Sequence, residues 1–207
     1  STLDVHQTFE NLIGREQLPA EFLKKIDKFQ YTAWSLFGLH LAMHEPAHLK
    51  ATAFDPTIHR TMKWSLGPET MEDLIAAHTD VMAGRVPKIV QFGAGPLSVL
   101  DPTQAPPGKH TQYAWHVMPL APDLEGRDYE TFKEEFADRI MEVFARYAPN
   151  MTSKNIVGRY IYTGREYVAE FPQMRNGDIF MGAFSAEQVM YNHFGYRTPI
   201  TNLYMSG

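Results

Sequence analysis

Residues 129–147 carry the pattern that most tightly constrains the fold. Apolar side chains recur every three or four residues, beginning with Phe132 and Phe136, which is the spacing of one face of an α-helix. Asp128 stands where an N-cap residue is expected, and Pro149 ends the pattern. The sequence therefore predicts a long amphipathic helix with one buried face.

Shorter patterns predict the elements around this helix. A second helix is expected between the Gly67-Pro68 pair and Gly84, with an apolar stripe formed by Met71, Ile75, His78 and Met82. Strands are expected at 31–43, 57–64, 88–92, 110–118, 156–162 and 203–205, and short helices at 19–29 and after Thr163 and Ser185. The order is too irregular for βαβ winding, and the turns are hairpin-like. This predicts an α+β fold with a mixed, mainly antiparallel sheet and helices packed on it, in a single domain over 1–207.

Charge and composition exclude several classes of function. The net charge is −5 and the basic residues are scattered singly, so we expect no nucleic-acid partner. No apolar run reaches the ~18 residues of a transmembrane segment. The chain has no cysteine, which excludes disulfides and thiol chemistry and is compatible with the cytoplasm, where we expect the protein.

Residues 44–48 read His-Glu-Pro-Ala-His, which matches the zinc-peptidase motif, and His40 adds a third histidine four residues earlier. That chemistry requires a helix interior, where a proline costs about 3 kcal/mol. Pro46 also disfavours the helical conformation at Glu45, and the residues before it have a strand pattern. We therefore predict no metal site, and a zinc peptidase is the least favoured alternative.

Two further short patterns are interpreted as structural. The Gly93-x-Gly95 pair lacks the third glycine of a dinucleotide fingerprint and is followed by Pro96, so it predicts a turn. Three serines lack the context of a nucleophile elbow: Ser98, Ser185 and Ser206. No catalytic residue is assigned from these patterns.

Residues 96–110 contain the arrangement S-x-L-D-P-x-x-A-P-P-G-x-H, in which Asp101-Pro102 begins one turn and Pro106-Pro107-Gly108 stiffens a second. Further blocks follow in order: Phe136-Ala-Asp-Arg139, Tyr147-Ala-Pro149, Ile156-Val-Gly-Arg159, Gly177-Asp-Ile-Phe180, Ser185-x-x-Gln188, Tyr196-Arg-Thr-Pro-Ile200 and Leu203-Tyr204. Together they resemble the phytoene-desaturase-like FAD-dependent oxidoreductases of the amine-oxidase superfamily. Met181 departs from the pattern, because many relatives have a histidine after Ile-Phe.

The resemblance implies the substrate-binding domain of a flavoprotein that removes a hydride from a C–C or C–N bond and passes it to FAD. In such proteins a dinucleotide-binding half precedes this region, and a glycine-rich flavin loop follows the strand at 203–207. We therefore expect one substrate-binding domain that lacks its flanking FAD-binding segments, with FAD in the parent protein and none bound by this chain alone.

The implied partners are the missing FAD-binding domain and an apolar small-molecule substrate, and a homo-oligomer is left open. The rival interpretation is a stand-alone apolar small-molecule binding module without catalysis.

The same resemblance implies the site residues. The sheet and the loop around 181–184 would wall the pocket, with these candidate substrate contacts: Trp115, His116, Met181, Phe184, Gln188, Tyr191 and His193. Ser206 and Gly207 are the candidate cofactor-binding residues. Core packing is the alternative role for Trp115 and Tyr191.

We also expect an exposed apolar face where the flavin domain would dock. It would be formed by Met181, Phe184, Tyr191 and Phe194, and its exposure predicts that the chain self-associates.

Overall fold

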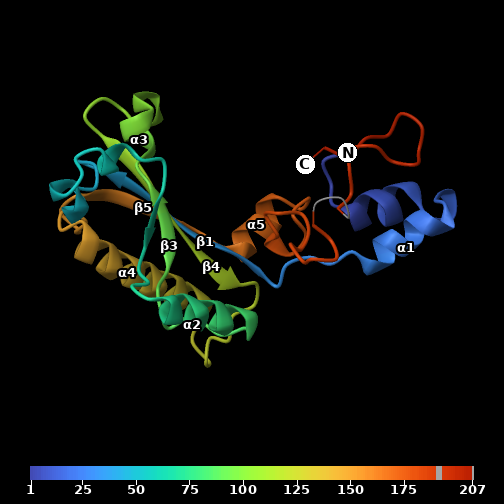
Figure 1. Ribbon diagram of the computed structural model, residues 1–207, viewed down its shortest axis with the longest axis horizontal. Coiled ribbons are helices and arrows are strands. Elements are labelled where there is room, and N and C mark those ends of the chain that lie inside the picture. Colours follow the sequence, from blue (N-terminus) through green and yellow to red (C-terminus); the bar gives the residue numbers. More distant parts are fainter. Residues whose placement is uncertain (190–192, 207) are drawn as a thin grey trace. The chain divides into compact units, whose positions relative to one another are not determined.

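The computed structural model describes residues 1–189 and 193–206 (Figure 1). The chain divides into two compact units. Ser1–Ser35 and Gly164–Gly207 form the first, here named the terminal unit, and Leu36–Thr163 form the second, here named the sheet unit. Tyr191 and Gly207, two of the predicted site residues, lie outside the described residues.

The sheet unit is built on five strands in the order β2-β3-β4-β1-β5. Their bounds are Trp34–Met43 for β1, Trp64–Leu66 for β2, Phe92–Gly95 for β3, His110–Pro119 for β4 and Ile156–Tyr162 for β5. The pairs β2–β3, β3–β4 and β1–β5 are antiparallel. The predicted α+β fold with a mainly antiparallel sheet is confirmed.

Helix α4, Tyr129–Tyr147, packs along one face of this sheet (Figure 1). The Asp128 side chain accepts a hydrogen bond from the Thr131 backbone N–H, so the predicted N-cap is present. The buried residues follow the predicted spacing: Phe132, Phe136, Ala137, Ile140, Val143 and Phe144. They meet the inward side chains of β1, which include Phe37, Leu39 and Leu41, and form the main core with them.

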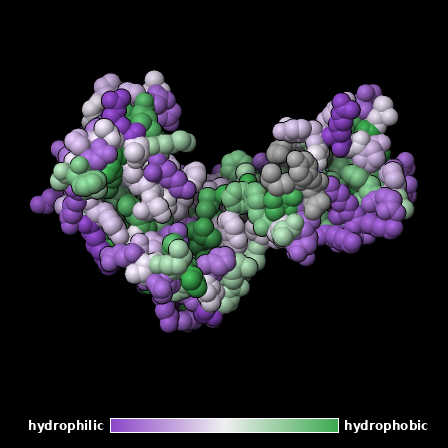
Figure 2. Space-filling view, viewed as in Figure 1, coloured by the Kyte–Doolittle hydropathy of each residue, from purple (hydrophilic) through white to green (hydrophobic). Residues whose placement is uncertain are grey.

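Helix α2, Met71–Met82, begins and ends close to the prediction but buries a different face. Met71, Ile75 and Met82 are 64, 60 and 56% exposed, and Figure 2 shows hydrophobic residues at the surface where α2 lies. Ala77 and Val81 are the buried residues instead. Apolar residues lie on two sides of this helix, so its periodicity alone does not identify the buried side.

Two predictions about the sheet were wrong, one for the strand at 57–64 and one for the turn at Gly93-x-Gly95. Within 57–64, Ile58–Arg60 forms a 3₁₀ turn, and the Trp64 indole N–H donates to the Ile58 carbonyl at 2.9 Å. β2 is therefore confined to Trp64–Leu66. Likewise Gly93-x-Gly95 lies within β3 rather than in a turn, because its glycines pair with residues of β4.

The terminal unit contains α1, Ala20–Lys28, α5, Gly164–Glu170, and a π-helical segment, Gln7–Ile13. Its small core is aromatic: Phe9 and Phe22 lie with ring centroids 4.8 Å apart, and Phe194 lies 5.2 Å from Phe29. The predicted helices at 19–29 and after Thr163 are present. Residues 185–188 form a turn instead of the predicted helix, with the Gln188 N–H donating to the Ser185 carbonyl at 3.0 Å.

The predicted strand at 203–205 is reduced to one bridge, between Tyr204 and Arg197. The Ser1 amino group donates to the Tyr204 carbonyl at 2.6 Å, and the Ser206 N–H donates to the Ser1 carbonyl at 2.7 Å. These two segments, far apart in the sequence, therefore lie side by side. In the described part of the chain no helix is long and apolar enough to cross a membrane.

Candidate functional site

The face of the sheet opposite α4, here named the open face, carries apolar side chains at the surface. Residues alternate between the two faces along each strand, so Trp115 and Val117 of β4 and Tyr160 of β5 point away from α4. They are 40, 37 and 55% exposed. The open face is therefore an apolar surface presented by rigid strands.

Glycines pair with aromatic residues on this open face. Gly95 lies opposite Tyr113, and Gly93 lies opposite Trp115. A third pair joins Gly38 of β1 to Tyr162 of β5. A Cβ atom on Gly95 would come within 2.6 Å of the Tyr113 ring, so the ring lies directly over the glycine backbone. The Tyr113 and Trp115 ring centroids are 4.6 Å apart. The two rings are tilted by 39°, and Trp115 supplies most of the exposed area because Tyr113 is only 8% exposed. The pair thus offers an apolar contact surface to a cyclic ligand.

His116, predicted beside Trp115 as a substrate contact, points to the opposite face of β4. It is 2% exposed, and its ring lies 4.8 Å from that of Phe136 in the core. Its Nδ1 atom lies 2.5 Å from the Val117 carbonyl oxygen. Burial lowers the pKa of His116 to about 4, so the imidazole is neutral at neutral pH.

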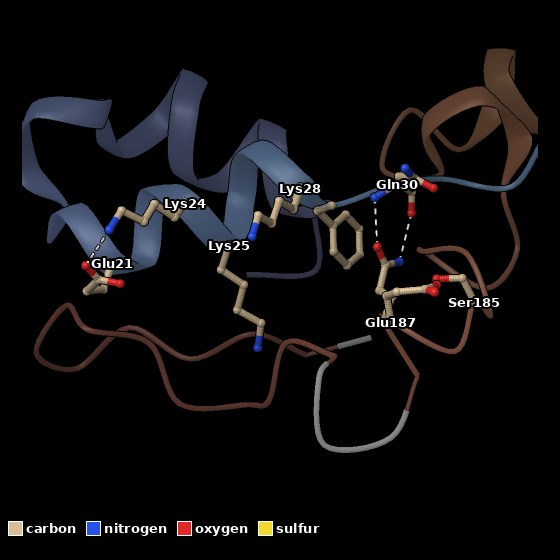
Figure 3. Close-up of a pocket in the computed structure, with 9 residues that line it drawn as sticks. Glu21, Lys24, Lys25, Lys28, Gln30, Ser185 and Glu187 are labelled. Carbon is tan, nitrogen blue, oxygen red and sulfur yellow. Dashed lines mark hydrogen bonds and ion pairs between the residues drawn. The ribbon is translucent and has the colours of Figure 1, made fainter.

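Gln188, in the terminal unit, is held by backbone groups. Its Oε1 atom accepts from the Gln30 N–H at 2.8 Å, and its Nε2 atom donates to the Gln30 carbonyl at 2.9 Å (Figure 3). The Nε2 atom also donates to the Ala183 carbonyl at 3.0 Å. It is 7% exposed. The block Ser185-x-x-Gln188 thus fixes the chain between α1 and β1.

Asp178 provides a second attachment to the segment that leads from α1 into β1. Its carboxylate is fully buried and accepts from the Thr32 N–H at 2.9 Å and the Phe180 N–H at 3.0 Å. The Ser35 hydroxyl donates to the Gly177 carbonyl at 2.6 Å. The Gly177-Asp-Ile-Phe180 block therefore has a structural role that sequence reasoning did not assign to it.

The other predicted contacts in the terminal unit differ in exposure. Phe184 is 68% exposed, with its ring 4.9 Å from that of Phe180. Met181 is half-buried, with a left-handed φ of 56°. His193 packs edge-on against Phe29, with ring centroids 5.6 Å apart. Ser206, predicted as cofactor-binding, is exposed. The structure thus gathers most of these residues in the terminal unit and places Trp115 in the sheet unit.

The exposed apolar face expected at 181–194 is only partly present among the described residues. Phe184 is exposed, but Phe194 packs against the aromatic core of the terminal unit. Its ring also lies 4.5 Å from the Lys25 ammonium group, so part of the predicted docking surface is internal.

A pocket of about 600 Å³ lies between α1 and residues 185–188 (Figure 3). Lys24 forms an ion pair with Glu21 at 2.7 Å, and the Lys25 ammonium donates to the His193 carbonyl at 2.8 Å. Burial lowers the pKa of Lys25. The lining has three ammonium groups and two carboxylates, so its charges largely offset each other. Sequence reasoning missed it because Lys24, Lys25 and Lys28 of α1 meet residues 185–188 only in the folded chain.

The three histidines of the zinc-like motif do not meet on a helix. His40 lies on β1, whereas the His44 Nδ1 atom lies 2.8 Å from the Lys109 ammonium nitrogen. The Glu45 backbone N–H donates to the Asn155 side chain at 2.8 Å in an irregular segment. Within 1–189 and 193–206, no group of three or more His, Cys, Asp or Glu side chains could hold a metal ion.

The motif at 96–110 forms a closed structural loop. The Asp101 carboxylate accepts from the Thr103 N–H at 3.0 Å and its hydroxyl at 2.7 Å. Ser98 Oγ lies 3.2 Å from His110 Nδ1 and accepts from the Thr111 N–H at 3.0 Å. The first and last residues of the motif are therefore joined directly, which positions the start of β4.

No family model matches the chain. Over its whole length, the chain is 27% identical to a limonene dehydrogenase subunit of Castellaniella defragrans, of which it covers 39%. Over 97% of its length, it is 28% identical to the pyridine nucleotide-disulfide oxidoreductase domain-containing protein 2 of Mus musculus, of which it covers 36%. The chain thus spans less than two fifths of either relative. It is distantly similar, along nearly all of its length, to proteins named as oxidoreductases or for an oxidoreductase domain.

Proposed function

We propose that this chain is the substrate-binding domain of an FAD-dependent oxidoreductase of the phytoene-desaturase-like type. The observation that carries the proposal is the open face, where Trp115, Val117 and Tyr160 present apolar surface on a sheet whose other face is closed by α4. The similarity to two much longer oxidoreductase-related proteins supports it.

The residues present do not fit the dinucleotide part of FAD. Gly93 and Gly95 lie inside β3, and α3, Leu97–Leu100, is a helix of only four residues, too short to provide a phosphate site at its N-terminus. In this proposal, FAD is bound by residues outside these 207 and supplies the hydride acceptor when bound.

The chain's own residues would bind and orient the substrate and exclude water from it. A cyclic hydrocarbon placed on the rings of Tyr113 and Trp115 would lose its hydration and its rotational freedom. The space over Gly93 and Gly95 is occupied by the Lys63 side chain and the Tyr113 ring, so the ligand would contact the rings and not the glycine backbone. An apolar small molecule is therefore the substrate class that we propose.

Trp115→Ala in the full-length protein is expected to slow flavin reduction at least tenfold while leaving flavin content unchanged, because it removes the largest ring of the open face. The measurement is anaerobic flavin reduction by cyclic hydrocarbons, starting with limonene, the compound named in the bacterial relative. Phe54→Ala is the control, since Phe54 is 93% exposed and lies off the sheet. Equal rates for Trp115→Ala and the unaltered protein would contradict the assignment.

A further inference from the structure

Strand β5 forms one edge of the sheet and presents its outer side to solvent. The strand order places β5 beside β1 alone, and the isolated bridges found in the described residues lie elsewhere. Residues 157–160 are all exposed, so no described segment covers this edge. An uncovered edge presents a row of unpaired backbone N–H and C=O groups, which can pair with a further strand.

The devices that usually protect a sheet edge from pairing are weak in β5. The strand contains no proline and no lysine, and Arg159 is its one charged residue. The Arg159 guanidinium forms ion pairs with Asp138 at 2.5 Å and with Glu134 of α4, so its charge is directed at the chain's own helix. A register shift against β1 displaces the strand only before Gly158. The rest of β5 is therefore a straight edge without an unpaired charge.

Both faces of the sheet have room for an added strand at this edge. On the open face, a Cβ atom built on Gly158 would meet no atom within 4 Å. On the other face, a hollow of about 580 Å³ lies between α4 and the start of β5, and its lining includes Met141, Ala145 and Ile156. These apolar side chains are only half-buried, so their further burial against a partner would be favourable.

The edge is self-complementary, which favours a second copy of the chain as the added strand. Antiparallel pairing about a two-fold axis at Tyr160, which is 55% exposed, puts the two Tyr160 rings opposite each other, and such aromatic pairs are stabilising. It also puts Gly158 opposite the partner's Tyr162, the same combination that Gly38 makes with Tyr162 inside the sheet. An axis at Arg159 would instead place two like charges directly opposite each other, which is destabilising.

We propose that β5 is an interface between two copies of this chain, which pair antiparallel, edge to edge, with Tyr160 at the two-fold axis. The two sheets then become one continuous sheet, and the two open faces lie on the same side of it, because the axis is perpendicular to the sheet. The inference goes beyond the proposed function and stands without it, since this pairing requires neither flavin nor substrate.

Charge variants at the axis test this interface in the 207-residue chain by sedimentation equilibrium. Tyr160→Lys and Tyr160→Glu each place two like charges opposite each other, so each is expected to weaken dimer formation by at least about tenfold. An equimolar mixture of the two variants places an ammonium group opposite a carboxylate, so dimers should return. An unaltered chain that stays monomeric at the highest concentration measured, or a mixture of folded variants that stays monomeric, would overturn the proposal.

Two control variants separate this interface from other modes of self-association. Tyr196 is 74% exposed and lies in the terminal unit, so Tyr196→Lys is the matched control and should leave the dimer unchanged. Dimers that are lost in Phe184→Ser but kept in Tyr160→Lys would assign the association to Phe184 and contradict the proposal. If the charged variants do not keep the melting temperature of the unaltered chain, Tyr160→Ser replaces them, and it is expected to weaken dimer formation about threefold.

Discussion

Phe136→Ala is expected to lower the free energy of unfolding of the sheet unit by about 3–5 kcal/mol. Phe136 is 1% exposed, and its ring centroid lies 5.0 Å from that of Phe37 and 4.8 Å from that of His116. Truncation removes these contacts and leaves a cavity between α4 and the sheet, because the strands cannot collapse into it. Urea unfolding of the chain measures the effect.

Phe54→Ala is the matched control for this truncation. Phe54 is 93% exposed, so the same chemical change is expected to alter the free energy of unfolding by no more than about 0.5 kcal/mol. If the two variants lost similar stability, the packing of α4 against the sheet would be wrong.

Acidification from pH 6.5 to pH 4 is expected to cost about 3 kcal/mol of stability through His116 alone. Burial holds its pKa at about 4 in the folded chain, against an ordinary histidine pKa of 6.5. Between these values the unfolded chain binds the proton and the folded chain does not, so the unfolded state gains stability as the pH falls. Well above pH 6.5 His116 is neutral in both states, and its contribution no longer changes with pH.

His116→Leu isolates this effect, because leucine cannot titrate while the surrounding carboxylates remain. The free energy of unfolding of the variant should fall less steeply between pH 6.5 and pH 4 than that of the unaltered chain. Parallel pH profiles would show that His116 is not buried as described.

The parts of the fold predicted best from sequence were those with redundant local signals. α4 combines strong periodicity with the Asp128 cap and the Pro149 stop, and its bounds match the prediction. α2 lies between the predicted Gly67-Pro68 pair and Gly84, which has a left-handed φ of 72°. Its buried face depends on which side meets the sheet, and that is decided by tertiary packing rather than by local sequence.

The candidate site was predicted only in part, for a similar reason. Strand alternation is local, so it could already have separated Trp115 from His116. The glycine–aromatic pairs of the open face depend on which strands are neighbours, and Gln188 depends on its meeting with Gln30. Neither relationship is encoded within one segment. Self-association through Phe184 stays a prediction.

The flavin content of two purified proteins tests the central proposal most directly. One is the full-length protein that contains this chain, and the other is the 207-residue chain by itself. The proposal predicts one FAD per full-length polypeptide and no stoichiometric flavin on the chain alone, because the dinucleotide site lies outside it. A full-length protein that folds and binds no flavin, or a short chain that purifies with one flavin per molecule, would contradict it.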